Sequence, residues 1–307
     1  MKRIITGATG MVASAVLRQW VTSGHKVLAV GRSRGRIAAL YGAQVRALEW
    51  EDLAALSGDE TKDVDVVLNL AGASIAEKRW TPQRKEEILN SRVDATRRAA
   101  EFCARHGLTL MNASAVGIYG MHKAFGRGLD EAAPAASASN DFLAMVCRKW
   151  EEAAAPARAK GCRVVHLRFG VILNAEEGAF PKMLLPFKLF MGGPLGSGNQ
   201  PVAWVSLRDA VKAIDFLCSR PDIAGPVNVV SPGCLTQKEL ARAIGKAVHR
   251  SGRVPTPGFI LKIVLGEMAG ALLLNGQRVL PNILLESGFK FEHKYIDDFL
   301  KSLKMKI

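Results

Sequence analysis

Features of a disulfide-bonded or metal-binding protein are missing from this sequence. The five cysteines are odd in number and none belongs to a Cys-x-x-Cys pair, and the six histidines include no pair at metal-ligand spacing. A disulfide framework and a zinc site are therefore not expected. The cysteine usage indicates a reducing compartment, and we expect a cytoplasmic protein without a bound metal.

Long apolar runs are also absent. The chain reaches the Thr6-Gly7 turn after only two apolar residues, so its start does not resemble a signal peptide. The most apolar late segment, 259–274, carries Lys262 and Glu267 and is shorter than the roughly 20 residues that a membrane-spanning helix needs. We expect this segment to form a buried helix, and we expect no membrane partner.

Acidic residues are few relative to basic ones. Lys and Arg total 42 against 28 Asp and Glu, which gives a formal net charge of +14. Such an excess favours phosphate binding, but no recognised nucleic-acid motif accompanies it and aromatic residues make up only 7%. Nucleic acid is therefore not expected as a partner. The 49% apolar and 23% charged contents are those of a globular protein and exclude disorder and coiled coil.

Short apolar runs alternate with helical patterns through the first half of the chain. This alternation predicts a doubly wound parallel sheet with helices on both faces, an α/β fold. The predicted strands are 3–6, 26–30, 44–47, 65–70, 108–113 and 163–169, and the predicted helices are 11–22, 82–106 and 141–159. Glycine and proline then become frequent. We therefore predict a Rossmann-like sheet domain over 1–170, a return strand near 226–230, and a smaller C-terminal α/β lobe over 171–307; the motifs below assign cofactor binding to the first and substrate binding to the second.

A glycine-containing turn joins the first predicted strand to the first helix. Gly7 permits a tight turn, Gly10 lets a pyrophosphate approach the backbone, and the helix N-terminus offers free N–H groups. Ala13 takes the third small position, where the helix packs on the strand. The alternative is a βα turn that binds nothing. The residues expected to contact the nucleotide are Gly7, Thr9, Gly10, Met11 and Val12.

The second predicted strand is followed by Arg32, Ser33 and Arg34, where an NAD site usually has an acidic residue for the ribose 2′-hydroxyl. Guanidinium groups suit a 2′-phosphate, so we predict NADP(H) as the cofactor. A solvated basic turn is the alternative. Residues 1–50 hold eight Lys and Arg against one acid, which is half of the net charge. The basic excess therefore points to a phosphorylated cofactor more than to nucleic acid.

Four motifs together carry a family likeness. They are Thr6-Gly7-x-x-Gly10, Asn69-Leu70-Ala71-Gly72, Ser114 to Gly120 (SAVGIYG) and Gly192 to Gly198 (GGPLGSG). The chain resembles extended short-chain dehydrogenases/reductases, and specifically the atypical epimerase-family, SulA-like NAD-dependent epimerase/dehydratase proteins. The resemblance implies a Rossmann-type domain that binds NADP(H), with a C-terminal lobe over the active site. It departs from the family where Ala13 replaces a glycine and Ser206 replaces a histidine.

Tyrosine is scarce, and this bears on catalysis. The superfamily typically uses a Tyr-x-x-x-Lys pair on a helix, but the expected helix here has Phe142 and Val146 at those positions. The literal match, Tyr119 with Lys123, lies in a loop. The chain has only Tyr41, Tyr119 and Tyr295.

The candidate catalytic groups are therefore Ser114, which would orient a carbonyl or else cap its strand, and Tyr119. Ala71 and Gly72 are expected to lie against the cofactor ribose, whereas Asn69 is expected to be structural. Arg278 is a candidate ligand for an anionic substrate group, with a structural ion pair as the alternative.

Two functions remain open from the sequence. One is an NADP(H)-dependent oxidoreductase or epimerase/dehydratase acting on a small or sugar-like substrate. The other is a non-catalytic NADP(H)-binding regulator or scaffold. A homodimer through helices 83–106 and 141–159 is expected by analogy with related folds.

Overall fold

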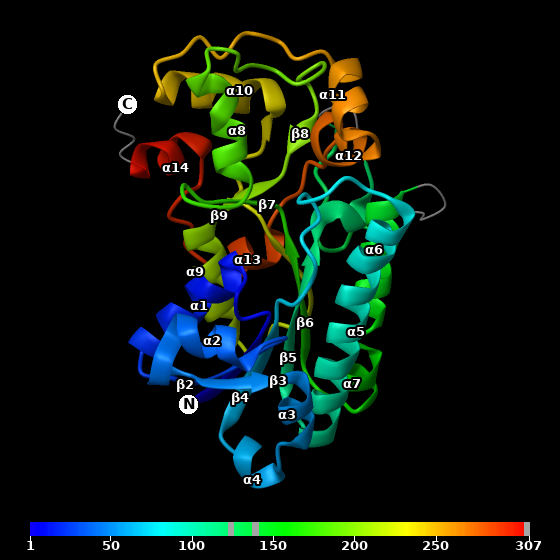
Figure 1. Ribbon diagram of the computed structural model, residues 1–307, viewed down its shortest axis with the longest axis vertical. Coiled ribbons are helices and arrows are strands. Elements are labelled where there is room, and N and C mark those ends of the chain that lie inside the picture. The colour runs from blue at the N-terminus through cyan, green and yellow to red at the C-terminus, as the bar shows by residue number, and fades with distance from the viewer. Residues whose placement is uncertain (122–125, 137–140, 304–307) are drawn as a thin grey trace.

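The computed structural model describes residues 1–121, 126–136 and 141–303. Its centre is a seven-stranded sheet with the strand order β10-β6-β5-β4-β1-β2-β3, and all neighbouring strands run parallel (Figure 1). The strands are β1 (Lys2–Thr6), β2 (Lys26–Gly31), β3 (Arg46–Glu49), β4 (Val64–Asn69), β5 (Thr109–Ala115), β6 (Val164–Phe169) and β10 (Gly225–Val229). The α/β, Rossmann-type sheet predicted from the sequence is confirmed, including the return strand.

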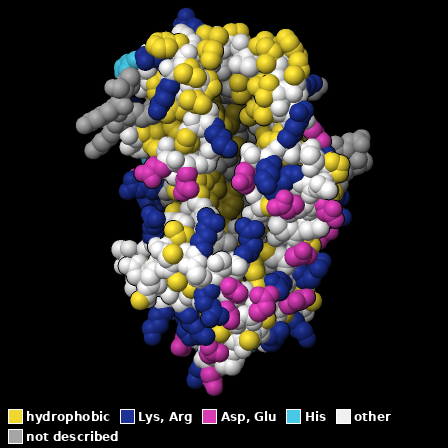
Figure 2. All heavy atoms as spheres, in the orientation of Figure 1, with side chains coloured by type: hydrophobic (Ala, Val, Ile, Leu, Met, Phe, Trp, Pro, Cys, Tyr) yellow, Lys and Arg dark blue, Asp and Glu magenta, His cyan; other side chains and the backbone are white. Residues whose placement is uncertain are grey.

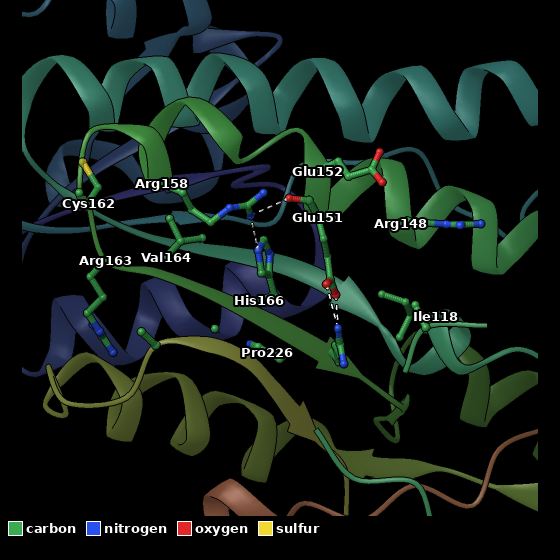
Figure 3. Close-up of a pocket in the computed structure, with 15 residues that line it drawn as sticks. Ile118, Arg148, Glu151, Glu152, Arg158, Cys162, Arg163, Val164, His166 and Pro226 are labelled. Atoms are coloured by element: carbon green, nitrogen blue, oxygen red, sulfur yellow. Dashed lines mark hydrogen bonds and ion pairs between the residues drawn. The ribbon is translucent and has the colours of Figure 1, made fainter. Parts of the chain in front are cut away.

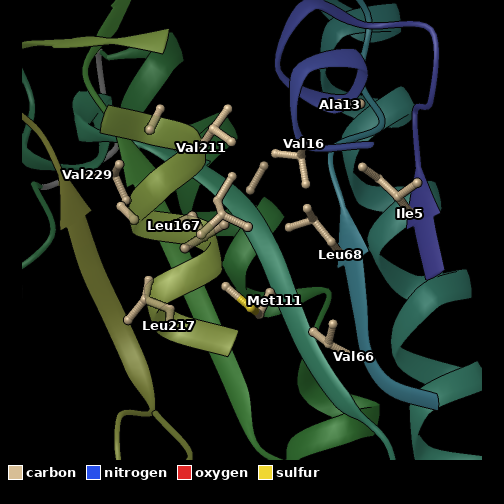
Figure 4. Packing of buried hydrophobic residues seen from close by; sticks show 14 of the residues in the cluster. Ile5, Ala13, Val16, Val66, Leu68, Met111, Leu167, Val211, Leu217 and Val229 are labelled. Carbon is tan, nitrogen blue, oxygen red and sulfur yellow. The ribbon is translucent and has the colours of Figure 1, made fainter. Parts of the chain in front are cut away.

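Helices cover both faces of the sheet because alternate strand residues point to opposite sides. Ile5 belongs to the apolar cluster under α1 (Met11–Thr22) and α9 (Leu207–Cys218), whereas Ile4 belongs to the cluster under α5 (Pro82–His106) and α7 (Ala155–Ala159). Figure 4 shows the first cluster, in which side chains from the two helices meet the central strands. Both faces of the sheet are therefore covered by apolar side chains, which explains why the strand sequences are apolar at nearly every position.

One carboxylate fastens α9 to the start of the chain. Asp215 accepts hydrogen bonds from Arg3 Nη1 at 2.8 Å, Gln19 Nε2 at 2.7 Å and Trp20 Nε1 at 2.9 Å. The helix that precedes β10 is thereby held against β1 and α1, although about 200 residues separate them in the chain.

Smaller elements complete the sheet domain and build the C-terminal lobe. Beside the sheet lie α2 (Arg34–Tyr41), α3 (Trp50–Ala55), α4 (Gly58–Thr61), α6 (Phe142–Glu152) and the 3₁₀ turn Val116–Tyr119. The rest of the chain forms β7 (Val171–Leu173), α8 (Ala179–Lys188), β8 (Pro201–Val202), β9 (Trp204–Ser206), β11 (Leu235–Thr236), α10 (Gln237–Ala247), α11 (Gly258–Leu265), α12 (Glu267–Ala269), α13 (Asn282–Glu286) and α14 (Ile296–Ser302). An apolar cluster between α8, α10 and α14 gives this lobe its own core.

Three sequence predictions need correction. The segment 259–274 is not one buried helix: it divides into α11, α12 and a short π-helical turn, and α11 has no buried residue. The predicted helix 141–159 breaks into α6 and α7 because Pro156 stands in the first turn of α7. The third strand along the chain begins at Arg46 rather than Gln44.

Among the described residues, no helix combines the length and the apolar content needed to cross a bilayer.

Candidate functional site

The turn after β1 has the backbone geometry that the sequence predicts. Gly7 adopts a φ of +68°, which favours glycine, and a Cβ added there would lie 2.8 Å from the backbone of Ala71. The turn closes with a hydrogen bond from Gly10 N to Gly7 O at 2.9 Å. The carboxyl ends of β1 and β4 therefore touch at the point where Gly7 meets Ala71.

The N-terminus of α1 is open to an anionic ligand. No side chain caps it, and no acidic residue stands in its first turn. Thr9 and Gly10 are exposed, Met11 and Val12 are half-buried, and Ala13 is buried against the strand. Free N–H groups at a helix N-terminus, with glycines that allow close approach, fit a dinucleotide pyrophosphate. The turn therefore satisfies the structural requirement for the predicted cofactor.

Tyr41 supports this turn from below, a role that the sequence did not reveal. Its hydroxyl donates to Ala8 O at 2.7 Å and lies 2.8 Å from Ser14 Oγ, and its ring is buried. No local pattern indicated this role, because the partners Ala8 and Ser14 lie 33 and 27 residues away from Tyr41 in the chain. The contact ties α2 to the turn and to the first helix.

The three residues predicted to hold a 2′-phosphate have different surroundings. Arg32 is exposed after β2, and no hydrogen bond or ion pair of its side chain is found in the described part of the chain. Ser33 Oγ accepts from Arg36 N and caps α2. Arg34 Nη2 lies 2.7 and 2.6 Å from the two Asp52 carboxylate oxygens. Arg32 is therefore the guanidinium group available in this conformation.

The segment after β4 is held by buried polar groups. Asn69 accepts from Thr6 Oγ1 at 2.5 Å and donates to Thr96 Oγ1 at 3.0 Å and Asn112 Oδ1 at 2.6 Å, so its predicted structural role is confirmed. This buried network joins β1, β4, β5 and α5 beneath the turn that follows β1. Gly72 is exposed above it.

Two arginines of α5 hold the same segment from its other side. Arg92 donates to Ala73 O at 3.0 Å, and a Cβ at Gly72 would lie 3.2 Å from the Arg92 side chain. Arg84, which is 6% exposed, donates to Ser74 O. Both guanidinium groups therefore fix the backbone that follows Ala71.

Ser114 and Tyr119 belong to one buried polar chain around Arg168. Ser114 Oγ donates to Glu151 Oε1 at 2.7 Å, and Arg168 binds both oxygens of Glu151 at 2.9 Å. Arg168 Nη1 also donates to Tyr119 Oη at 2.9 Å, and Tyr119 Oη donates to Asn228 Oδ1 at 2.9 Å. The structure brings both predicted catalytic residues into this network.

Burial and charge shift the pKa values of the network in opposite directions. Burial raises the pKa of the Tyr119 hydroxyl, and the nearby Arg168 only partly opposes this. Burial also favours the neutral form of Glu151, but the hydrogen bond and charge of Arg168, with His166, lower the pKa of that carboxyl. Glu151 is therefore an anion and Tyr119 a neutral phenol near neutral pH.

The helix on which the sequence resemblance would place an acid/base pair, α6, is used for packing here. The Phe142 ring lies edge-on to Trp80 with centroids 5.0 Å apart, and Lys85 lies 5.1 Å from the Phe142 centroid. Val146 is buried. The candidate partner of Tyr119, Lys123, lies outside the described residues.

The second lobe contacts the end of the turn after β1, residues 7–10, which we call the phosphate turn. A Cβ at Gly178 would lie 3.1 Å from Met11 Sδ, so the loop before α8 contacts the start of α1. Figure 2 shows a hollow between the C-terminal lobe and the sheet domain. Arg278 Nη1 donates to Gly126 O at 3.2 Å, and the neighbouring Gln277 donates to Gly120 O at 2.6 Å. Both side chains tie the C-terminal segment to the loop after Tyr119.

A separate pocket of about 590 Å³ lies away from the phosphate turn (Figure 3). It is lined by the starts of β6 and β10 and by residues of α6 and α7, and Glu151 and Arg168 of the buried polar chain line it as well. His166 lies in its floor, 3.1 Å from Arg158 Nη1. Ligands of parallel sheets bind outside the carboxyl ends of the strands, so a pocket at the strand starts is not where a dinucleotide is expected. The pocket nevertheless reaches Glu151 and Arg168, which contact Ser114 and Tyr119.

All five cysteines are free thiols. Within the described ranges, no group of three or more His, Cys, Asp and Glu side chains has the geometry to hold a metal ion.

Comparison with known proteins gives matches over nearly the whole chain. The model of the NAD dependent epimerase/dehydratase family matches residues 3–230, and a domain of unknown function (DUF1731) matches residues 256–303. Epimerase family protein Mb2239 of Mycobacterium bovis is 37% identical over 298 residues, which cover 96% of this chain and 95% of the relative. Epimerase family protein YfhF of Bacillus subtilis is 34% identical over 308 residues, which cover 99% and 98%.

Solved structures match the fold as well. The human epimerase family protein SDR39U1, crystallised with NADPH, is 28% identical, with a TM-score of 0.88 and full coverage of both chains. The protein MoeE5, solved with UDP-glucose and NAD, is 19% identical with a TM-score of 0.71 over 99% of this chain and 100% of its own, and it shares the fold. The likeness drawn from the sequence motifs is confirmed.

Proposed function

Because the chain belongs to the NAD-dependent epimerase/dehydratase family, we propose that it binds NADP(H) and transfers hydride to or from a small or sugar-like substrate. The observation that carries the proposal is the turn at Gly7 and Gly10 beneath an uncapped α1, with Arg32 exposed at the end of β2. The NADPH bound to the human relative supports the choice of cofactor. The nicotinamide cofactor would supply the hydride chemistry, while this chain binds and orients it.

Arg32 is the residue proposed to distinguish NADP(H) from NAD(H). An arginine–phosphate contact contributes about 1.5–3 kcal/mol, so Arg32→Ala should weaken NADPH binding by about tenfold to a hundredfold. NADH binding should change little. Isothermal titration with both cofactors measures this, and Arg18→Ala, an exposed arginine on α1, is the matched control. Tighter binding of NADH than NADPH by the unchanged protein would refute the cofactor preference.

The proton transfer that accompanies hydride transfer has three candidate sources: Tyr119, a water molecule or the substrate. Tyr119 is buried, and its hydroxyl is bound to Arg168 and Asn228, so a catalytic role requires that it exchange one of these partners for substrate. Ser114 would orient a substrate carbonyl only by leaving Glu151.

A single substitution separates these sources. Tyr119→Phe should lower kcat by at least tenfold if the phenol transfers the proton, and Tyr295→Phe, at an exposed site, serves as the control. Unchanged turnover in Tyr119→Phe would leave water or the substrate as the proton source.

A second candidate function is NADP(H) binding without catalysis. The observation that favours it is α6, where Phe142 packs on Trp80 and Val146 is buried in place of an acid/base pair. This function predicts tight NADPH binding with no NADPH oxidation across a panel of aldehydes, ketones and nucleotide sugars. Robust oxidation with any panel member would refute it.

We also propose a cytoplasmic homodimer that pairs through α5 and α6. These helices lie side by side along one flank of the sheet (Figure 1). Sedimentation velocity of the purified protein tests the assembly, and Arg97→Glu on the exposed surface of α5 should weaken it.

A further inference from the structure

Exposed apolar side chains gather at one end of the C-terminal lobe. Of the fourteen large hydrophobic residues that the described chain exposes, nine lie on α8, on α11 and on the loops beside them. We call this surface the apolar tip. Its members are Leu185, Leu189, Phe190, Met191, Val254, Phe259, Ile260, Ile263 and Val264. Figure 2 shows hydrophobic side chains concentrated at this end of the molecule.

The loop parts of the apolar tip are joined by backbone hydrogen bonds. Val254 N donates to Gly192 O at 3.2 Å, and Thr256 N donates to Pro194 O at 2.8 Å. Residues 190–196 and 250–258 therefore run side by side, and α11 continues directly from the second of them. Neighbouring chain segments thus bring these side chains together into one surface, so they are not isolated exposed residues.

The backbone at Phe190 holds an aromatic ring out in solvent. Phe190 has a φ of +61°, which a non-glycine residue adopts at an energetic cost, and it is 69% exposed. Arg250 lies over the ring, 4.2 Å from its centroid. His249, beside Arg250, is the other non-glycine residue with positive φ in the described part of the chain. A strained position that exposes an apolar ring indicates a partner for that ring.

The chain segments that build the apolar tip hold basic but no acidic side chains, although Glu267, which is paired with Lys85, follows α11. No Asp or Glu occurs in residues 178–208 or 240–266, whereas the average acid content of the chain, 28 in 307, would place about five in these 58 residues. Seven exposed cations occupy the same stretches: Lys182, Lys188, Arg208, Arg242, Lys246, Arg253 and Lys262. Arg208 is paired with Glu292 at 2.6 Å, which leaves six with no ion pair among the described residues. A second copy of the chain would bring like charges together, while an anionic surface would attract every one of them.

We propose that the apolar tip adsorbs to the surface of an anionic phospholipid bilayer. The exposed side chains of α11 and Phe190 insert among the headgroups and upper acyl chains, and the surrounding Lys and Arg contact lipid phosphates. The eight residues of α11 are about 12 Å long, so the helix lies on the bilayer and does not span it. The expectation of no membrane partner was drawn from spanning length, and this proposal concerns a contact at the bilayer surface that requires no spanning helix.

Co-sedimentation with vesicles tests the proposal with the full-length protein. Phosphatidylcholine vesicles containing 30% phosphatidylglycerol should bind at least tenfold more protein than pure phosphatidylcholine vesicles, and binding should fall as salt rises. The double variant Phe259→Ser/Ile263→Ser should lose at least tenfold of this binding. Leu40→Ser, at an exposed leucine of α2, is the matched control and should bind normally.

A charge-reversal pair gives an independent measurement if the serine variant folds poorly. Arg253→Glu/Lys262→Glu should reduce binding to the anionic vesicles, since each lost cation near the membrane is worth about fivefold in affinity. Arg18→Glu/Lys290→Glu, at exposed sites elsewhere, controls for net charge. Equal reduction by both pairs would overturn the proposal, because general charge would then explain the binding.

Two further results would overturn it. One is unchanged vesicle binding in a folded Phe259→Ser/Ile263→Ser variant. The other is lipid-free self-association that this variant abolishes, measured by sedimentation velocity, which would assign the apolar tip to a second copy of the chain.

Discussion

His166 should make the stability of this protein depend on pH between 7 and 4. The ring lies on β6 with 5% of the residue exposed, and Arg158 donates to its Nε2. Because arginine cannot accept, the proton of the neutral ring sits on Nδ1. Burial, with the charges of Arg158 and Arg168, lowers the pKa of His166 to about 4, although Glu151 opposes the shift.

The sign follows from comparing the folded and unfolded states. An unfolded histidine takes up its proton as pH falls through about 6.5, whereas folded His166 stays neutral until about pH 4. The unfolded state therefore binds the extra proton over this window, and stability falls with falling pH. The loss from this residue should be roughly 2 kcal/mol at pH 5 and roughly 3 kcal/mol at pH 4, relative to pH 7.5.

Urea unfolding at several pH values measures the effect. His166→Gln keeps an acceptor for Arg158 and removes the titrating ring, so the gap between wild-type and variant stability should change by roughly 2 kcal/mol from pH 7.5 to pH 5. His249→Gln, at an exposed histidine, is the control. A gap that stays constant with pH, or an NMR-measured pKa of His166 near its ordinary value, would refute the reasoning.

Three further substitutions test the site and its support. Asn69→Ala should destabilise the fold by about 2–5 kcal/mol, measured by urea unfolding, because it leaves several buried polar groups without partners; a loss below 1 kcal/mol would contradict the network. Gly7→Ala should reduce NADPH affinity by more than tenfold in a fluorescence titration, since the new methyl group would collide with the backbone of Ala71; normal affinity would argue against the phosphate turn. Glu151→Ala should cost about 3–5 kcal/mol in thermal or urea unfolding because it leaves Arg168 buried without its counter-charge, whereas Glu152→Ala, on the same helix, should cost little.

Local pattern predicted most of the sheet domain. Strands buried on both faces read as apolar runs, and the Thr81-Pro82 pair marks the start of α5, which ends at His106 as predicted. The phosphate turn could also be predicted from the sequence, because its two glycines, the strand before it and the helix after it are adjacent in the chain. These features depend on interactions within a few residues of one another.

Features that depend on distant residues could not be predicted in the same way. The sequence around Arg34 does not indicate its ion pair with Asp52. This ion pair leaves Arg32 as the guanidinium group that is available to a ligand. The support of the phosphate turn by Tyr41 and the contact of Tyr119 with Arg168 and Asn228 could not be predicted either. In both cases the partners come close only in the folded chain. The apolar segment after Pro257 was expected to be buried, but composition cannot say whether a covering element exists, and α11 has none in the described structure.

Because β6 and β10 are neighbours in the sheet, the chain cannot complete the sheet during synthesis, or in a truncated form, until β10 is present. All six residues of β6 are buried, and its outer neighbour is supplied 56 residues later, after β7, α8, β9 and α9 have been synthesised. A nascent chain that has reached only residue 170 therefore displays a long apolar edge with unpaired backbone groups, a template for association with other chains. Truncation at that point should give aggregates rather than a small nucleotide-binding domain, whereas the chain becomes safe in this respect once Val229 has joined the sheet.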